Sequence, residues 1–415
     1  MNCPEPSELQ ELVRQLHRQA SPWLPAGHGT RLHWGPAVQP GPAEAEPLVV
    51  STARLDRLIE HCVGDFTVTV QAGLPLQQLQ AELGRRKQWL AIDWPWGSGP
   101  GGEGSGTVGG LVARGLAGGL RQRYLGVRDQ LIGIGLLRAD GTAARAGGKV
   151  VKNVAGYDLM RLFTGSWGSL GLITELTLRT FPLPPRRAGL LMRGDLQALE
   201  QLRRLCLAAP LMPQRLDWWS PEGHGQTEPA LLLSVVSVSA EAIHDQLSQH
   251  RRAAEAAGLA VQPLEAEALQ ALEAVGQGWG QGDPRPWLLH LGVLPARAAE
   301  LLGDPALQGL RLTLAAGAGV GLAWADATGL PLHRVEELRR RCSALGGFLS
   351  VLQQPSAAAG AAGMPAWGDA PSRPLIEAIK REFDPLQQLA RGRLPGVAPQ
   401  PQPSPESHST IARFT

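Results

Sequence analysis

The sequence contains few cysteines for its length. Only Cys3, Cys62, Cys206 and Cys342 occur among 415 residues, they lie far apart, and none forms a CxxC pair. A zinc ribbon or a cysteine-ligated iron–sulfur cluster needs closely spaced thiolates, so neither is expected within this chain. The four residues are expected to be free thiols in a reducing compartment.

A strong net charge and long apolar runs are also missing. The 39 basic and 37 acidic side chains give a formal net charge of +2, and no basic block is present. This balance offers no electrostatic case for binding nucleic acid or a lipid surface. No apolar run approaches the ~18–20 residues that span a bilayer, and the N-terminal segment lacks the apolar core of a secretory signal. We therefore expect a cytoplasmic protein without a transmembrane segment.

Glycine and proline, in contrast, are abundant. The 51 glycines and 34 prolines indicate many turns and close backbone approaches, and 415 residues suffice for two or three domains. In the first part of the chain, apolar residues recur at helical and strand spacings in alternation, which predicts a small α/β unit. The predicted helices cover 7–19 (with Ser7 as cap), 53–62 and 74–86, and the predicted strands cover 48–52, 66–73 and 89–93.

A hairpin and a further strand complete this part of the chain. Two apolar runs around Asp140-Gly141 predict a hairpin over 131–148 with a two-residue turn. Residues 172–181 alternate between apolar and polar side chains, as in a half-buried strand. The prolines at 182–185 end that strand and indicate a domain boundary.

The second half predicts a separate α+β domain. Strand-like runs alternate there with helical stretches at 241–257 and 331–345, which predicts one antiparallel sheet covered by helices. The predicted division of the whole chain is an N-terminal helix at 1–19, a first domain at 20–185, the α+β domain at 187–353, a flexible linker at 355–373, a C-terminal segment at 374–396 that starts with a helix at 374–382, and a disordered tail at 397–415.

Two glycine-rich loops suggest a ligand. One is PAGHGTRLHWG (25–35) and the other is GSGPGGEGSGTVGG (97–110). The second contains a GxGxxG match at 104–109, but loop residues precede it where a Rossmann fold has a strand, so that fold is not favoured. Backbone N–H groups in such a loop before a helix still suit a pyrophosphate, and a loop without a ligand is the alternative.

A third segment, VVKNVAGYDLMRLFTGSWGSLG (150–171), combines polar and small residues in a pattern that packing alone does not require. It places five polar or charged side chains among small and apolar ones, and glycine then recurs at every third position. The polar residues are Lys152, Asn153, Tyr157, Asp158 and Arg161, and the glycines are Gly165, Gly168 and Gly171.

Taken together, these segments resemble the FAD-binding domain of the vanillyl-alcohol-oxidase/MurB (PCMH) type. Residues 25–30, 97–110, 121–141 and 149–184 follow the family's order and spacing. Within the family, the chain resembles the FAD-binding subunits of bacterial glycolate oxidase (glycolate dehydrogenase). The resemblance implies an α+β fold in which a two-subdomain FAD-binding domain precedes an α+β cap domain with an antiparallel sheet.

The resemblance also implies where FAD is bound. The implied FAD-contacting residues lie in the two loops and the third segment: Ala26, Gly27, His28, Gly29, Thr30, Gly35, Gly104, Ser105, Gly106, Thr107, Val108, Gly109, Gly110, Tyr157, Asp158, Gly168 and Ile173. Ile173 would contact the flavin through its backbone, whereas Tyr157 and Asp158 either contact it or brace the fold. His28 stands between the two glycines and not after them, unlike the histidine of members that attach FAD covalently, so non-covalent FAD is expected.

The catalytic groups are less well defined by the resemblance. Lys152 and Asn153 are candidates near the flavin, where a cation would attract an anionic 2-hydroxy acid, although Lys152 could equally be a solvated surface charge. No HxxH or HxxxH pair is present, so no metal site is expected. The family's C-terminal FDP…NPGR pattern is kept at 383–385 but reads LARGR at 389–393.

The function implied by the resemblance is that of a redox subunit. It would bind FAD and oxidise glycolate or a related D-2-hydroxy acid together with a larger flavoprotein subunit and an iron–sulfur subunit, through which electrons leave. A membrane would be reached only through those partners. Two alternatives stay open: a flavin-binding scaffold without its own turnover, and a stand-alone FAD-dependent oxidase of another alcohol or hydroxy acid.

Overall fold

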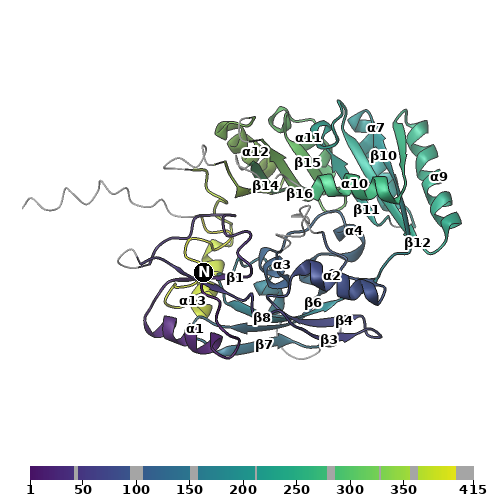
Figure 1. The fold of residues 1–415 in the computed structure, drawn as a ribbon. Coiled ribbons are helices and arrows are strands. Elements are labelled where there is room, and N and C mark those ends of the chain that lie inside the picture. Colours follow the sequence, from purple (N-terminus) through teal and green to yellow (C-terminus); the bar gives the residue numbers. More distant parts are fainter. Residues whose placement is uncertain are drawn as a thin grey trace, which may run out of the picture.

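The computed structural model describes residues 1–41, 45–93, 106–149, 158–210, 213–277, 286–326, 329–355 and 363–398. Within these ranges two sheets lie one above the other (Figure 1). The smaller has the strand order β3-β4-β8-β6-β7, and the larger has the order β13-β10-β12-β11-β15-β16-β14-β17. Every pairing within the two sheets is antiparallel, and the α+β class is confirmed.

The smaller sheet is covered by short helices on the side that faces the larger sheet (Figure 1). Its strands are β3 (Leu58–Cys62), β4 (Thr67–Gln71), β6 (Leu131–Leu137), β7 (Ala143–Gly147) and β8 (Leu172–Arg179). The helices of this part are α2 (Leu76–Arg85), α3 (Val108–Arg114), α4 (Arg121–Tyr124), α5 (Val127–Gln130) and α6 (Met160–Phe163). The helix predicted over 74–86 is confirmed, with Leu76, Leu79 and Leu83 fully buried.

The first and the last described segments of the chain pack beside the smaller sheet. Helix α1 (Leu9–Arg18) and the parallel pair β1 (Trp23–Ala26) and β2 (Leu48–Ser51) lie next to α13 (Arg373–Phe383). The backbone of Trp23 is bonded on both sides to the segment after α13, since its N–H donates to the Gln388 carbonyl and its carbonyl accepts from the Ala390 N–H, both at 2.9 Å. This segment therefore forms part of the scaffold that supports the first loop.

The larger sheet is covered by helices on both faces. Its strands are β10 (Arg186–Arg193), β11 (Arg215–Trp219), β12 (Ala230–Ser237), β13 (Ala260–Leu264), β14 (Trp287–Gly292), β15 (Arg311–Ala315), β16 (Val320–Ala325) and β17 (Phe348–Gln353). Its helices are α7 (Leu196–Ala208), α8 (Pro221–His224), α9 (Ala240–Ala256), α10 (Ala266–Gln277), α11 (Ala298–Leu302) and α12 (Leu332–Ala344), with 3-10 turns at Pro295–Arg297 and Pro305–Leu307. The predicted antiparallel sheet and the helices at 241–257 and 331–345 are confirmed.

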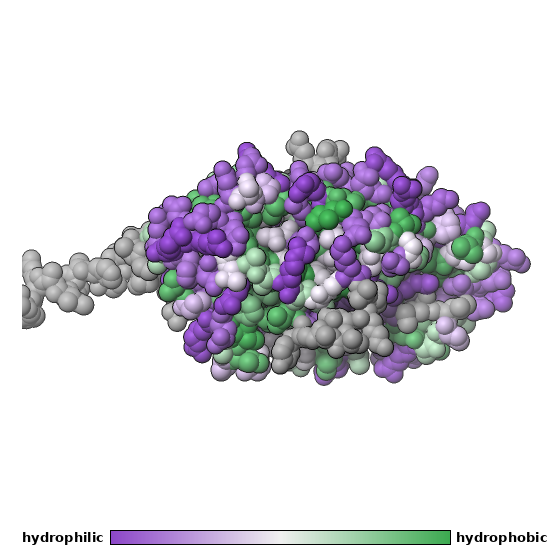
Figure 2. Space-filling view, turned by 90° about the horizontal axis from the view of Figure 1, so that it is seen from below, coloured by the Kyte–Doolittle hydropathy of each residue, from purple (hydrophilic) through white to green (hydrophobic). Residues whose placement is uncertain are grey.

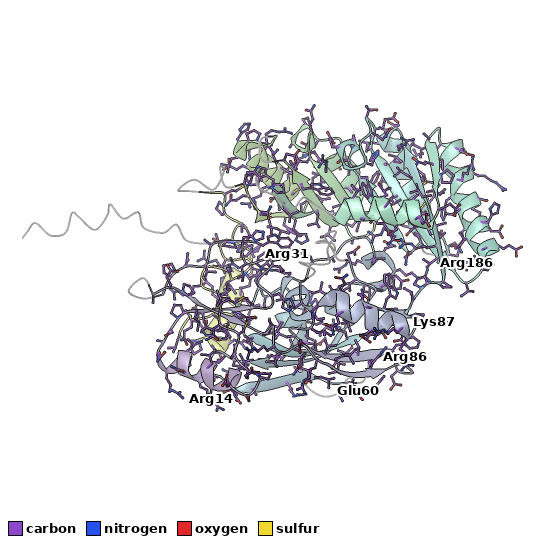
Figure 3. All side chains as sticks on the ribbon, viewed as in Figure 1. Arg14, Arg31, Glu60, Arg86, Lys87 and Arg186 are labelled. Carbon is purple, nitrogen blue, oxygen red and sulfur yellow. The ribbon has the colours of Figure 1, made fainter. Side chains whose placement is uncertain are left out.

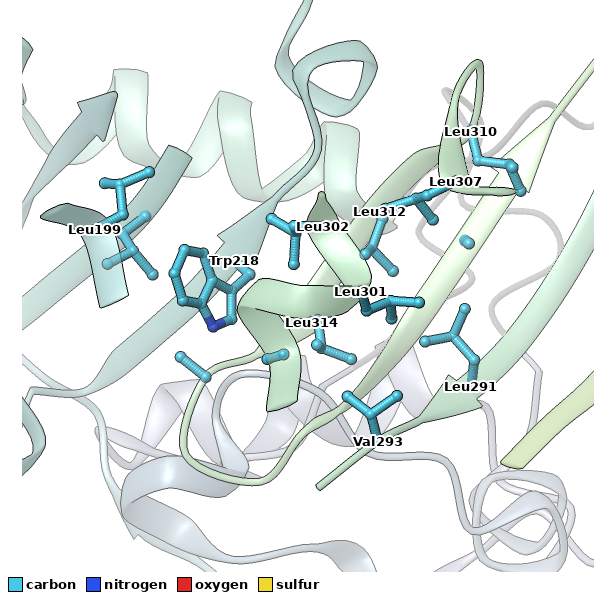
Figure 4. Packing of buried hydrophobic residues seen from close by; sticks show 14 of the residues in the cluster. Leu199, Trp218, Leu291, Val293, Leu301, Leu302, Leu307, Leu310, Leu312 and Leu314 are labelled. Atoms are coloured by element: carbon cyan, nitrogen blue, oxygen red, sulfur yellow. The ribbon is translucent and has the colours of Figure 1, made fainter. Parts of the chain in front are cut away.

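Alternating side chains of the larger sheet form two separate cores. Leu301 and Leu302 of α11 pack with Trp218, Leu312 and Leu314 of the strands on the outer face (Figure 4). On the inner face, α10 covers one end of the sheet, and the other end packs against the core formed by the smaller sheet and its helices. The inner-face residues that share a core with the smaller sheet are Leu288, Leu322, Trp324 and Leu352. The two layers are therefore joined by apolar packing.

Two local predictions were wrong, and a third was right except for the length of its turn. Residues 53–62 do not form a helix, because Leu58–Cys62 pairs with β4 as an edge strand and strand pairing overrides the helical spacing of the leucines. Ser7 does not cap α1, whose N-cap is Glu8 without a side-chain hydrogen bond. The hairpin is confirmed, but its turn is longer than two residues: Gly141, at φ +79°, donates to the Arg138 carbonyl, and the Arg138 N–H donates to Thr142.

Two further predictions hold only in part. The strand predicted over 89–93 is limited to β5 (Gln88–Trp89), which pairs with β9 (Phe181–Pro182). The predicted flexible linker contains Met364, Ala366 and Trp367, all at least 94% buried, so that stretch is packed. Residues 356–362 and 399–415 lie outside the described part, and the domain division at about residue 185 stays a prediction.

Candidate functional site

A cleft opens between the first glycine loop, α3 and the start of β8. Figure 3 shows Arg31, one of its lining residues, between the two layers, whereas Arg14, Glu60 and Arg86 lie on the outside of the smaller one. The cleft encloses about 820 Å³ of empty space, part of it open to solvent. Its lining consists of Pro25, Ala26, Gly27, His28, Gly29, Thr30, Arg31, Leu32, Thr52, Ala72, Gly106, Thr107, Gly109, Gly110, Leu111, Ala113, Arg114, Trp167, Gly168, Gly171, Leu172 and Ile173.

The first loop offers backbone donors to the cleft. It follows β1 and is held by its carbonyl groups, because the Ser51 hydroxyl donates to Gly27 at 2.7 Å and the Thr52 N–H donates to Ala26 at 2.8 Å. In the described part of the chain, nothing accepts a hydrogen bond from the N–H groups of residues 28–30. These N–H groups are therefore available to an anionic ligand.

The second loop differs from this expectation, since the N–H groups of residues 108–110 are already used. Val108 and Gly109 donate to the carbonyls of Leu74 and Ala72, at 3.0 and 2.8 Å. The Gly110 N–H donates to the hydroxyl of Thr107, which caps α3, at 3.0 Å. Gly104 and Ser105 lie outside the described residues. The start of α3 thus supplies the cleft with small residues and not with free donors.

The loop glycines fall into two groups by what a side chain would meet. A Cβ at Gly27 would lie 2.4 Å from the Thr107 hydroxyl, and one at Gly109 would lie 2.8 Å from Ala72. Gly27 and Gly109 therefore allow close packing between neighbouring segments of the protein. At Gly110 a Cβ would meet only the Thr107 hydroxyl, at 3.2 Å, so this glycine leaves room in the cleft itself.

Among the described residues of the third segment, the later ones reach the cleft. Gly168, at φ +74°, and Ile173 line the cleft, as does Gly171. Asp158 does not: it is about half exposed and forms an ion pair with Arg161 at 2.6 Å. Lys152, Asn153 and Tyr157 lie outside the described residues, so their predicted place near the flavin stays a prediction.

Two other predicted positions lie behind the lining. Val108 is fully buried in the core beneath α3. Gly35, at φ +75°, would place a Cβ 2.4 Å from the ring of Trp167, and its N–H donates to the Leu352 carbonyl of β17 at 2.7 Å. Gly35 therefore connects the first loop to the larger sheet and does not contact the cleft.

The prediction from sequence missed the aromatic and cationic part of the lining. The guanidinium of Arg114 lies 3.7 Å from the centre of the Trp167 ring, and its Nη2 donates to the Arg31 carbonyl at 3.0 Å. Its Nη1 is buried and has no hydrogen-bond partner. Burial holds the pKa of Arg114 well below its usual value, and the nearby charges of Arg393 and Arg31 lower it further. A cation on a helix of seven residues carries no local sequence signal of this role.

The C-terminal segment supports the first loop from behind. Arg393 donates to the carbonyls of Pro36 and Leu32, at 2.8 and 2.6 Å, and burial lowers its pKa to about 10. Lys380 donates to the Ser169 carbonyl at 2.7 Å and pairs with Asp384. The LARGR sequence that stands where NPGR is expected therefore contacts the walls of the cleft.

The face of the molecule shown in Figure 2 is mostly hydrophilic, with apolar residues scattered between polar ones. No helix in the described ranges is long and apolar enough to cross a bilayer. Within the same ranges, no three His, Cys, Asp or Glu side chains gather as metal ligands would.

Comparison with known families assigns the part of the chain that forms most of the cleft to a family. Residues 2–147, which include the first loop, α3 and four of the five strands of the smaller sheet, match the model of the FAD-binding domain family. This part of the chain is an FAD-binding domain. FAD is thus its cofactor, and the cleft formed by the domain's loops is the candidate site for it.

Relatives of the FAD-binding domain occur among curated proteins. The chain is 32% identical over 204 residues to glycolate oxidase subunit GlcE of Escherichia coli, covering 49% of this chain and 54% of the relative. It is 34% identical over 197 residues to D-2-hydroxyglutarate dehydrogenase of Xanthomonas citri, and 31% identical over 213 residues to glycolate oxidase subunit GlcD of Bacillus subtilis. These matches cover 47% and 51% of this chain, and 39% and 43% of the relatives. The chain thus spans about half, or less, of each relative's length.

Solved structures extend the similarity beyond the FAD-binding domain. An alkyldihydroxyacetonephosphate synthase structure matches 94% of this chain and 75% of its own, with a TM-score of 0.65 and 14% sequence identity. At this identity the match concerns the fold alone. It includes the larger sheet, so the arrangement of the two layers also occurs in that protein.

Proposed function

We propose that the chain binds one FAD non-covalently in the cleft and serves in the oxidation of glycolate or a related D-2-hydroxy acid. The observation that carries the proposal is the cleft itself, because its walls come from the first loop and α3 of the FAD-binding domain and from the start of β8.

The lining residues fit the parts of FAD. The N–H groups of residues 28–30 would hold phosphate oxygens, and the guanidinium of Arg114 would balance negative charge. Ala72, Leu111 and Ile173 form apolar walls suited to aromatic rings. When bound, FAD supplies the chemistry, since it accepts a hydride from the carbon that carries the hydroxyl group and passes electrons on. The chain orients FAD and limits the access of water.

Lys152 and Asn153 are the proposed groups near the substrate. A carboxylate substrate needs a cation beside the flavin, and Lys152 belongs to the segment that leads into the cleft wall at Gly168. His28, the one histidine of the lining, is exposed. Since it stands between two glycines of the loop, we propose that it contacts FAD without forming a covalent bond.

We further propose that the chain works with a larger flavoprotein subunit and an iron–sulfur subunit. Relatives named as glycolate oxidase subunits support a complex. The four cysteines also support a separate electron carrier, because they are free thiols at distant positions, and Cys206 and Cys342 are buried. Electrons would then leave the flavin through a partner.

The test is dye reduction with glycolate, D-lactate and D-2-hydroxyglutarate, measured for the purified chain and for the chain with its partner subunits. We expect little turnover by the chain alone and an increase of orders of magnitude in the complex. Lys152→Ala in the complex should weaken substrate capture roughly 10- to 100-fold, the value of a charged hydrogen bond. Vigorous turnover by the isolated chain would support a stand-alone oxidase instead, and FAD binding without turnover in the complex would support a scaffold.

A further inference from the structure

Arg114 is a half-buried cation in the cleft wall, and no acid among the described residues forms an ion pair with it. Its Nη2 has the Arg31 carbonyl as acceptor, its guanidinium lies over the Trp167 ring, and its Nη1 is buried and unpaired. Across the described ranges, no carboxylate lies within 4.0 Å of its guanidinium. Burial of an unpaired charge is unfavourable, so a fold gains nothing by keeping one for packing alone.

The surroundings of Arg114 increase this cost. Arg31 lines the same cleft, and Arg393 is bound to the back of the first loop through the carbonyls of Leu32 and Pro36. Both are close enough for their charges to disfavour the charged form of Arg114. Three guanidinium groups thus gather at one wall, and the positive potential there is directed at a space that a ligand can enter.

The guanidinium is also held in place. Trp167, on which it lies, contacts the ring of Trp367 edge-on at 5.2 Å, and the Trp367 indole N–H donates to the carbonyls of Leu394 and Val397. A planar guanidinium held in this way, with no acceptor for Nη1 in the described part of the chain, can still donate to an oxygen of a carboxylate or a phosphate. The side chain therefore has the geometry of a receptor prepared before its ligand arrives.

We propose that Arg114 is the anion receptor of the cleft and binds an oxyanion directly. The chemistry is that of a carboxylate or phosphate group, supplied either by the substrate or by the pyrophosphate of FAD. The choice between these two sources rests on the proposed function, whereas the oxyanion site itself rests on the geometry of Arg114.

The test compares Arg114→Gln and Arg114→Lys with a matched control, Arg138→Gln. Arg138 also lies over an aromatic ring, that of Phe383, and donates to the Glu382 carbonyl, but it is outside the cleft. Three quantities are measured in the full chain: the dissociation constant of FAD from flavin fluorescence, that of oxalate from its effect on the flavin absorption of the loaded protein, and the melting temperature without FAD.

We expect Arg114→Gln to weaken one anion roughly 10- to 100-fold and to leave the melting temperature of the FAD-free chain within about 3 °C of the unsubstituted protein. Weaker FAD binding identifies the pyrophosphate, and weaker oxalate binding with unchanged FAD affinity identifies a substrate carboxylate. The anion affinity of Arg114→Lys should lie between those of Arg114→Gln and the unsubstituted protein, because lysine keeps the positive charge but lacks the planar set of N–H donors of a guanidinium. Arg138→Gln should change neither affinity.

Unchanged affinity for both anions in Arg114→Gln would overturn the proposal. If that variant does not fold, Arg114→Lys decides, and a lysine variant that binds both anions as tightly as the unsubstituted chain would overturn the proposal equally. If the chain takes up no FAD, the proposed function fails separately. Inorganic pyrophosphate, titrated by calorimetry, then reports on Arg114, and binding that Arg114→Gln leaves unchanged would contradict the oxyanion site.

Discussion

Two arginines, the half-buried Arg114 in the cleft and the buried Arg215 between the two layers, differ in how the protein compensates their charge. Arg215 of β11 forms ion pairs with Asp93 of the FAD-binding domain and Asp217 of the larger sheet, both at 2.8 Å, and with Glu273 of α10 at 3.3 Å. Burial lowers the pKa of Arg215, but these carboxylates raise it above its usual value. Among the described residues, Arg114 in contrast has one carbonyl, one indole ring and no acid as neighbours.

The contrast separates structural from ligand-binding charge. The charge of Arg215 is paired with carboxylates of the protein itself. Asp93 also accepts from the Gly118 and Leu120 N–H groups, so the cluster joins the two layers. The charge of Arg114 is left uncompensated at the wall of an open cleft. A negatively charged ligand would compensate the charge of Arg114 as Asp93 and Asp217 compensate the charge of Arg215.

The strongest way to break the comparison is to remove Arg215. Arg215→Met should lower the free energy of unfolding by roughly 3–5 kcal/mol, because it leaves buried carboxylates without a cation. Urea unfolding measures the loss. Arg187→Met is the matched control, since Arg187 pairs with the same Glu273 from a more exposed position and should cost about 1 kcal/mol or less. Equal losses in the two variants would contradict the structural role of Arg215.

The cluster around Arg215 should also make the free energy of unfolding depend on pH. Burial raises the pKa of Asp217 from 3.8 to about 6, although Arg215 opposes this shift. The folded state therefore keeps a proton that the unfolded chain releases, so stability falls as pH rises from about 4 through 6. Asp217→Asn stays neutral, and its stability relative to the unsubstituted protein should increase over this window by roughly 3 kcal/mol at most. Parallel pH profiles from urea unfolding would show that Asp217 does not titrate there.

Two neighbouring glycines of α3 distinguish packing from ligand space. Gly109→Ala should destabilise the fold by roughly 1–3 kcal/mol, because its Cβ would overlap Ala72. Gly110→Leu should leave the fold intact, because leucine favours a helix more than glycine does and its Cβ would meet only the Thr107 hydroxyl. The leucine side chain would fill part of the cleft, so the affinity for FAD should fall at least tenfold. Thermal unfolding and flavin fluorescence measure the two effects. A stable Gly110→Leu protein with normal FAD affinity would place FAD elsewhere.

The smallest effect on stability and on FAD content is expected for a substitution outside both the cleft and the Arg215 cluster. Asp158 and Arg161 form an ion pair in which each side chain is 48% exposed, so solvent screens it. Asp158→Ala should change the free energy of unfolding by less than about 0.5 kcal/mol and leave the FAD content unchanged. Loss of FAD from this variant would instead indicate that Asp158 contacts the cofactor, as the resemblance implies.

Local patterns in the sequence predicted the fold where one face of an element is buried. Leu76, Leu79 and Leu83 indicate α2 because the spacing and the burial agree. Leu58 and Ile59 mislead, since β3 is an edge strand whose residues are only partly covered and whose pairing is set by β4. Propensity in such a segment is weaker than the hydrogen bonds of a neighbouring strand.

The candidate site divides in the same way. The glycine loops are continuous in sequence, so their position beside a ligand could be predicted, and the structure brings residues 26–30, Gly106 and Gly110 to one cleft. FAD contact by each of them stays a prediction. Arg114, Trp167 and Arg393 meet only through tertiary packing, across more than 200 residues of sequence, so no local pattern signals their meeting.

The most direct test of the account is the flavin content of the purified chain. Absorbance in the flavin bands, before and after acid precipitation, gives both the amount of FAD and its mode of attachment. The account predicts about one FAD per chain, released into the supernatant by acid. Flavin that stays with the precipitate would indicate covalent attachment at His28, and a colourless chain that takes up no FAD on titration would contradict the assignment of the cleft.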